Sequence, residues 1–167
     1  IYDKNYGKAL EHTLTEANIS LQKELGNVNN YLTGVILRLY DDKIEYVNAA
    51  HPDVFIRHKD TVFPIRKKDN SSISGFYLGM AGMSLPFESI DVPVHKGDFI
   101  LCYSDCLIES KKGTDAYGSD RLIESFKNSP GDSPENCLNH IVNEFQTFIE
   151  ENPLIDDLTI IVIKKVK

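Results

Sequence analysis

The hydrophobic positions divide the chain into a helical segment, a strand-rich middle, a second helical segment and one last strand. An amphipathic helix is predicted over residues 7–25, because apolar side chains recur there at helical spacing: Leu10, Leu14, Ala17, Leu21 and Leu25. Gly26 followed by Asn27 is a typical C-terminal stop for such a helix.

From Tyr31 onward the pattern changes to that of β-strands. About six strands are predicted, at residues 31–40, 44–50, 53–58, 61–65, 89–94 and 99–105. Short polar turns join the first two strands and the next two, so each of these pairs should form a hairpin. The turn before the sixth strand is Lys96-Gly97-Asp98, and Gly97-Asp98 is ordinary turn chemistry.

The last third of the chain is expected to contain two helices and a strand. A flexible segment around Gly113 precedes a short helix at residues 119–127. Ser133-Pro134 is a typical start for a second helix, which Pro153 cannot continue, and the last strand covers residues 158–166. Strands grouped between helices, rather than alternating with them, predict an α+β fold with a layered antiparallel core.

Composition and charge narrow the class of protein. A chain of 167 residues with 41% apolar residues predicts one globular domain. The formal charge of −7, without a large basic cluster, argues against a nucleic-acid partner. No apolar run approaches the roughly 20 residues that a membrane span needs. The first residue is Ile1 rather than Met, so we expect a piece of a longer protein.

Two acidic stations, each set against an apolar strand, are the leading candidates for chemistry. Asp105 follows the strand that starts at Phe99, and the pair Asp156-Asp157 precedes the last strand. If the two strands are neighbours, Asp105 and Asp156 could share one hard cation such as Mg²⁺ or Mn²⁺. The alternative is that Asp156 and Asp157 only cap the turn after Pro153 and protect a strand edge.

Other candidate residues are weaker. His51 ends a strand at a proline-marked turn, where it is a metal ligand, a general acid or, as we favour, a hydrogen-bonding turn residue. Cys102 and Cys106 lack a second Cys or His pair for a zinc site and are interpreted as core residues. Three cysteines without a signal peptide suggest reduced thiols in the cytoplasm. No residue is singled out as a catalytic nucleophile or base, and no substrate-binding residue is identified.

Taken in order, several short motifs resemble the SpoIIE/RsbU-like branch of the metal-dependent, PPM-type serine/threonine protein phosphatases. That family has an Asn-Ala-Gly-His-Pro turn, a Leu-Gly pair, a Pro-Gly-Asp turn before an apolar strand and Thr-Asp-Gly, a Phe-Gly pair, and Asp-Asp-x-Thr at the last strand. The corresponding segments here are residues 48–52, Leu78-Gly79, residues 96–106, Tyr117-Gly118 and residues 156–159. Each motif is weak alone, but the ordered series spans nearly the whole chain.

The resemblance implies an antiparallel β-sandwich flanked by helices, in α/β/β/α layers, with a two-metal site of Mn²⁺ or Mg²⁺. In such a site the two cations hold a water for in-line attack on a phosphoryl group. Carried over by motif, Asp105 and Asp156 are metal ligands, and Asp157 is either a further ligand or a neighbour that supports them. The implied partners are a phosphoprotein substrate of the anti-sigma-factor-antagonist type and an upstream sensor or regulatory domain.

The departures from the family pattern also carry expectations. The Asp-x-x-Gly-His-Gly motif, whose Asp bridges both metals, is missing, and so are the first strands and first helix of the domain. Cys106 and Ala50 stand where the family has Gly. A Cys side chain beside the metal is expected to interfere with the close approach of backbone or substrate.

Two functions and one structural alternative follow from these expectations. The chain is the C-terminal part of a phosphatase and inactive alone, or it is a degenerate module that acts in regulation or binds a partner without catalysis. The structural alternative is a fragment of the sandwich that has lost its first strands. A homodimer through exposed strand edges is a further hypothesis.

Overall fold

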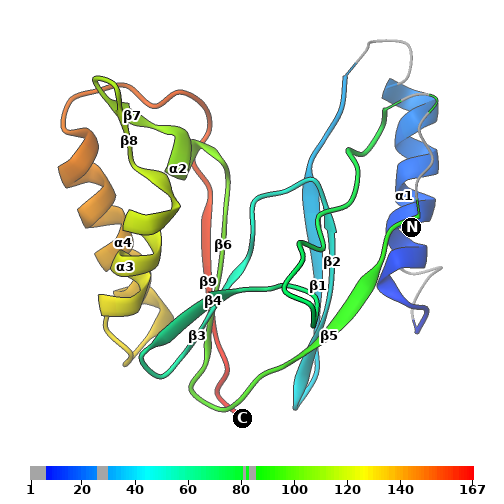
Figure 1. The fold of residues 1–167 in the computed structure, drawn as a ribbon, viewed down its shortest axis with the longest axis horizontal. Helices are drawn as coiled ribbons and strands as arrows, with labels where there is room; N and C mark the ends of the chain where they lie inside the picture. Colours follow the sequence, from blue (N-terminus) through cyan, green and yellow to red (C-terminus); the bar gives the residue numbers. More distant parts are fainter. Residues whose placement is uncertain (1–6, 26–29, 81, 83–85) are drawn as a thin grey trace. The chain divides into compact units, whose positions relative to one another are not determined.

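The computed structural model describes residues 7–25, 30–80, 82 and 86–167 as two compact units. The first unit consists of Ile1–His51 and Arg66–Val94, and the second of Pro52–Ile65 and His95–Lys167. Each unit combines antiparallel strands with at least one helix (Figure 1). The α+β composition predicted from the grouping of strands and helices is therefore confirmed.

The first unit is a three-stranded sheet with one helix packed on it. Its strands β1 (Gly34–Leu39), β2 (Lys43–Ala49) and β5 (Ser89–Pro93) lie in the order β1-β2-β5, all antiparallel. The helix α1 (Leu10–Leu25) buries Leu10 and Leu14 against Val47 and Ala49 of β2. Both predicted elements, the helix and the first hairpin, are confirmed; the predicted stop at Gly26-Asn27 lies outside the described residues.

Buried polar groups fix the position of α1 on this sheet. Glu45 of β2 accepts a hydrogen bond from the main-chain N–H of Leu10 (2.8 Å) and pairs with Arg38 (2.9 Å). Asn18 accepts one from the main-chain N–H of Gly79 (2.8 Å). Gly79 has φ +81°, and a Cβ there would meet the Leu25 side chain at 3.0 Å, so this position needs a glycine for its backbone.

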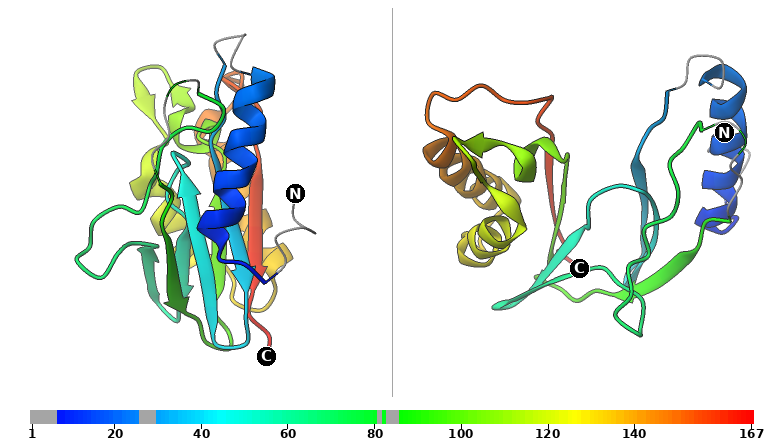
Figure 2. Two further views of the ribbon diagram at one scale, coloured as in Figure 1. Left: turned by 90° about the vertical axis from the view of Figure 1, so that its right-hand side faces the viewer. Right: turned by 45° about the horizontal axis from the view of Figure 1, so that its top comes forward.

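The second unit is a four-stranded sheet with helices against one face. The strands β3 (Phe55–His58), β4 (Thr61–Pro64), β6 (Phe99–Tyr103) and β9 (Ile160–Lys164) lie in the order β4-β3-β6-β9. Two helices, α3 (Gly118–Asn128) and α4 (Pro134–Ile149), lie side by side over this sheet (Figure 2). Their shared core is aromatic and aliphatic: Phe55, Leu101, Tyr103, Leu122, Phe126, Ile141 and Phe145.

A local signal in the sequence explains where α4 begins. The Ser133 hydroxyl accepts a hydrogen bond from the N–H of Asn136 (3.0 Å), and Pro134 occupies the first turn, as predicted for α4. None of the described helices is long and apolar enough to cross a membrane.

Three short elements were not predicted. Helix α2 (Cys106–Glu109) begins directly after Asp105, and the strand expected to reach Asp105 ends at Tyr103. The segment around Gly113, expected to be flexible, is a small hairpin of β7 (Lys111–Lys112) and β8 (Asp115–Ala116). Elements of two to four residues are too short for hydrophobic periodicity to show them.

Candidate metal centre

The two acidic stations lie at the same end of the second sheet. Strands β6 and β9 are antiparallel neighbours, with Tyr103 opposite Ile160, so the residues that follow β6 meet those that precede β9. The condition on which the shared site depended, that the two strands are adjacent, is therefore met. The pairing brings together Asp105 and Asp156, which are 51 residues apart in the chain.

Four hydrogen bonds hold the two loops against each other. Ser104 forms three of them: its N–H donates to the Thr159 carbonyl (2.9 Å), its hydroxyl donates to the Asp157 carbonyl (3.0 Å), and the Thr159 N–H donates to that hydroxyl (2.9 Å). The Cys106 thiol donates the fourth to the Asp156 carbonyl (3.0 Å). The sequence reasoning gave Ser104 no role, although its place before Asp105 in the Thr-Asp-Gly-like motif was a signal for one.

The carboxylates themselves are exposed and only partly engaged. Asp105 Oδ1 accepts from the Cys106 N–H (2.9 Å), and Asp156 Oδ1 accepts from the Asp157 N–H (2.8 Å). Each carboxylate thus keeps one oxygen without a partner among the described residues, at one end of the second sheet. Such oxygens are the ligands that Mg²⁺ and Mn²⁺ prefer, so the donor chemistry fits one hard cation that keeps several waters.

Asp157 does not complete a three-carboxylate cluster. Within the described part of the chain, Asp105, Asp156 and Asp157 do not form a group whose ligand atoms all lie within 4.8 Å of one another. Asp157 supports the site through its main chain instead. Its N–H donates a hydrogen bond to the Asp156 carboxylate, and its carbonyl accepts one from the Ser104 hydroxyl. The role of Asp105 and Asp156 as ligands stays a prediction from the motif.

The Cys106 side chain is fully buried rather than exposed at this site. Its sulfur lies 3.0 Å from the Asp156 carbonyl and 3.7 Å from the Ser110 hydroxyl. The thiol therefore acts as a tether between the two stations rather than as an obstacle in front of them. All three cysteines are free and buried, and burial raises the pKa of Cys102 to about 11. This confirms the interpretation of Cys102 and Cys106 as core residues.

The turn that contains His51 is held by Asn48. The buried Asn48 side chain accepts from the His51 N–H (2.8 Å) and donates to the His51 carbonyl (3.0 Å) and to the Tyr46 hydroxyl (2.7 Å). The His51 ring lies 3.2 Å from the Thr33 hydroxyl. His51 is thus the hydrogen-bonding turn residue that we favoured.

A family model and solved structures place the chain among known proteins. The model of the family described as Stage II sporulation protein E (SpoIIE) matches residues 4–166. A search of curated protein sequences gave no match.

Solved phosphatase domains share the fold at low sequence identity. The phosphatase domain of the cell fate determinant SpoIIE from Bacillus subtilis is 16% identical with a TM-score of 0.61, over 95% of this chain and 72% of that one. The SiaA-PP2C domain of Pseudomonas aeruginosa is 15% identical with a TM-score of 0.74, over 90% of this chain and 58% of that one.

The catalytic domain of the serine/threonine phosphatase PstP, in complex with two manganese ions, is 13% identical with a TM-score of 0.65, over 95% of this chain and 70% of that one. This chain thus spans about three fifths to three quarters of the length of these three domains. The fold is that of the PP2C-type phosphatases, as the motifs predicted. With the family model matching almost its whole length, the chain belongs to the SpoIIE family of PPM-type phosphatase domains.

Proposed function

We propose that this chain supplies the C-terminal part of a SpoIIE-like, metal-dependent phosphoserine/phosphothreonine protein phosphatase. The observation that carries the proposal is the β6–β9 pairing, which puts the two motif carboxylates, Asp105 and Asp156, at one sheet end. Family membership supports the same conclusion.

In this proposal Asp105 and Asp156 hold one Mn²⁺ or Mg²⁺, and the chain's main task is to keep them in place. The ion would supply the Lewis acidity that activates water and neutralises charge on a phosphoryl group. Ser104 and Cys106 position the two stations through their hydrogen bonds to the loop at residues 156–159. The bridging Asp of the family motif is absent from this chain, so a second ion needs a carboxylate from outside it.

The substrate and setting are proposed from the family resemblance. A phosphoprotein of the anti-sigma-factor-antagonist type is the expected substrate, an upstream sensor or regulatory domain the expected partner, and the cytoplasm the expected location. The acidic character of the chain, with a formal charge of −7, agrees with a protein rather than a nucleic-acid partner.

The test compares this chain with a longer chain of the parent protein in Mn²⁺-dependent hydrolysis of phenyl phosphate. We expect little or no turnover from this chain and clear turnover from the longer one. In the longer chain, Asp105→Asn and Asp156→Asn should each reduce the rate by roughly 100-fold or more, because each removes a metal ligand. Asp120→Asn, an exposed change in α3, is the matched control and should leave the rate unchanged.

The results separate the proposal from its alternatives. Robust turnover by this chain alone would contradict the account of the missing carboxylate. Activity that survives both substitutions in the longer chain would remove Asp105 and Asp156 from the metal centre.

A second candidate is a phosphatase-fold module that binds a partner without catalysis. Among the described residues, Asp105, Asp156 and Asp157 do not form a three-carboxylate cluster, and this favours it. This candidate predicts that the longer chain neither binds Mn²⁺ nor hydrolyses phenyl phosphate, although it folds.

A further inference from the structure

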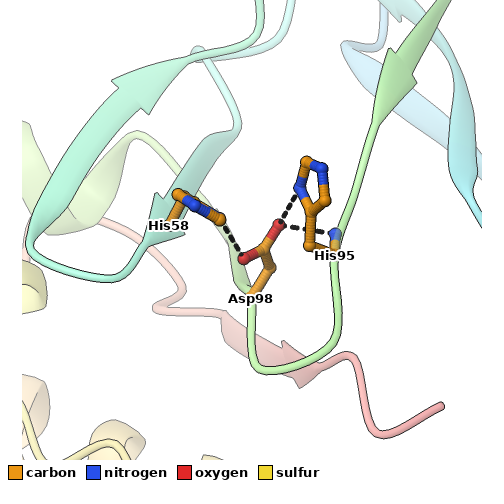
Figure 3. Close-up of side chains that lie close together, drawn as sticks. All are labelled: His58, His95 and Asp98. Atoms are coloured by element: carbon orange, nitrogen blue, oxygen red, sulfur yellow. Dashed lines mark hydrogen bonds and ion pairs between the residues drawn. The ribbon is translucent and has the colours of Figure 1, made fainter.

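The second unit contains a group of potential metal ligands at the sheet end opposite Asp105. His58 is the last residue of β3, Asp98 directly precedes β6, and His95 lies three residues before Asp98, across the turn (Figure 3). The five-residue strand β6 separates Asp98 from Asp105, a length of about 17 Å at roughly 3.3 Å per residue. This group is therefore distinct from the candidate phosphatase centre.

The three side chains converge on one carboxylate. His58 Nδ1 lies 2.7 Å from Asp98 Oδ1, and His95 Nδ1 lies 3.5 Å from Asp98 Oδ2. The centroids of the two imidazole rings are 5.0 Å apart, and one ligand atom from each residue lies within 4.8 Å of the others. Among the described residues, this is the only group of three or more His, Cys, Asp or Glu side chains that meets this distance.

These distances suit a small transition-metal ion. With ligand bonds of about 2.0–2.2 Å in a tetrahedral site, neighbouring ligand atoms lie roughly 3.3 Å apart. The separations of 2.7 Å to Asp98 Oδ1 and 3.5 Å to Asp98 Oδ2 end on different oxygens of one carboxylate. One ligand atom from each residue already lies within 4.8 Å of the others, so side-chain rotations can bring the three to that spacing. Two imidazoles and one carboxylate favour Zn²⁺, Co²⁺ or Ni²⁺ over Mg²⁺, which prefers oxygen ligands.

The carboxylate is held in place before any ion binds. Asp98 is 2% exposed, and its Oδ2 accepts from the main-chain N–H of His95 (2.8 Å). Main-chain hydrogen bonds from Asp98 N–H to the His95 carbonyl (3.0 Å) and from Lys165 N–H to the Asp98 carbonyl (2.8 Å) fix the turn. Since these bonds already account for the turn, neither imidazole is needed to form it.

The two histidines leave the site open to solvent. The His58 side chain is 37% exposed and that of His95 is 66% exposed. An ion can therefore enter from solvent and keep a water as its fourth ligand, as zinc sites with three protein ligands do.

We propose that His58, His95 and Asp98 form a binding site for a transition-metal dication of the Zn²⁺ class. The bound ion links the end of β3 to the turn before β6, and these segments are 40 residues apart in the chain. The site does not depend on the proposed phosphatase function. Because the folded chain presents the three ligands together and the unfolded chain does not, the ion should also raise the melting temperature.

The experiment uses the untagged chain after removal of metal with a chelator. Calorimetric titration with Zn²⁺ should show one equivalent bound. Co²⁺ in place of Zn²⁺ should give visible d–d absorption typical of a site with few ligands. Zn²⁺ should also raise the melting temperature of the chain. His58→Ala and His95→Ala should each weaken Zn²⁺ binding by roughly tenfold or more, because each removes one of three ligands. Both residues are partly exposed, so circular dichroism should show that the variants fold.

Matched controls separate this site from other histidines and from the phosphatase centre. His12→Ala, in the exposed face of α1, and Asp105→Asn should both keep the wild-type affinity for Zn²⁺. Excess Mn²⁺ should not displace the Zn²⁺. The proposal is wrong if the chain fails to bind Zn²⁺ at concentrations below about 100 µM. It is also wrong if the folded His58→Ala and His95→Ala variants bind Zn²⁺ as tightly as the wild type. Loss of binding in Asp105→Asn alone would assign the ion to the other end of the sheet.

Discussion

Ala50 shows at the scale of one residue why the family has glycine in its Asn-Ala-Gly-His-Pro turn. Its φ is +55°, in the left-handed region, where a Cβ meets the following carbonyl oxygen. The strain costs about 1–2 kcal/mol for a residue with a side chain. The turn keeps this conformation because Asn48 binds both the N–H and the carbonyl of His51.

Ala50→Gly should therefore stabilise the chain. Relief of the strain exceeds the extra unfolded-state entropy of glycine, about 0.4–1 kcal/mol, so we expect a gain of roughly 0.5–1 kcal/mol in the free energy of unfolding. Urea denaturation measures it. Ala49→Gly is the control: Ala49 is buried in β2 without positive φ, so its replacement should destabilise. A destabilised Ala50→Gly variant would refute the strain argument.

Arg57 connects two elements of the second unit, β3 and the end of α3. The side chain is 4% exposed, and its guanidinium donates to the carbonyls of Phe126 and Ser129, both at 2.7 Å. These carbonyls belong to the last turn of α3 and the residue after it, which have no partner within the helix. Burial lowers the pKa of Arg57 below its ordinary value, yet a guanidinium stays charged at neutral pH.

Arg57→Ala should be among the most damaging single substitutions in this unit. It removes the guanidinium donor from the Ser129 carbonyl and leaves the Phe126 carbonyl with only the Ser129 hydroxyl, so we expect a loss of about 3–5 kcal/mol in the free energy of unfolding. Lys127→Ala, an exposed change in the last turn of the same helix, should alter it by at most about 0.5 kcal/mol. Thermal and urea denaturation provide the values, and similar losses in both variants would show that the buried guanidinium has no special role.

At the scale of the whole molecule, unpaired strand edges are the feature with a consequence for assembly. Among the described strands, β1 and β5 border the first sheet, and β4 and β9 border the second. Ile161 on β9 is 50% exposed, so an apolar side chain lies on an edge strand. Such edges favour pairing with a second copy of the chain.

We accordingly expect a homodimer at concentrations of tens of micromolar, measured by light scattering after size-exclusion chromatography. Ile161→Lys should shift the mass to that of a monomer, because a charge on an edge strand opposes pairing. Ile19→Lys, an equally drastic change at an exposed position of α1, should keep the dimer. A wild-type mass of 18.9 kDa at all concentrations would end the hypothesis.

The sequence by itself was sufficient for the longer elements and for the family. Helix α1, helix α4 and both hairpins follow from apolar spacing and turn residues within a few positions of each other. The family follows from the order of short motifs, each of which is also local. Asp105 and Asp156 were found in this way, as residues at the ends of apolar strands, although their ligand role still awaits the substitution test.

Only the tertiary structure decided which of these residues meet. The β6–β9 pairing places Asp105 beside Asp156, and the β3–β6 pairing places His58 beside Asp98, whose turn the sequence had assigned to backbone geometry alone. Likewise, the Cys106 side chain, expected to interfere, is turned inward by burial and by its bond to the Asp156 carbonyl. Periodicity reports which face of an element is apolar, whereas strand order depends on packing between residues 40 or more positions apart.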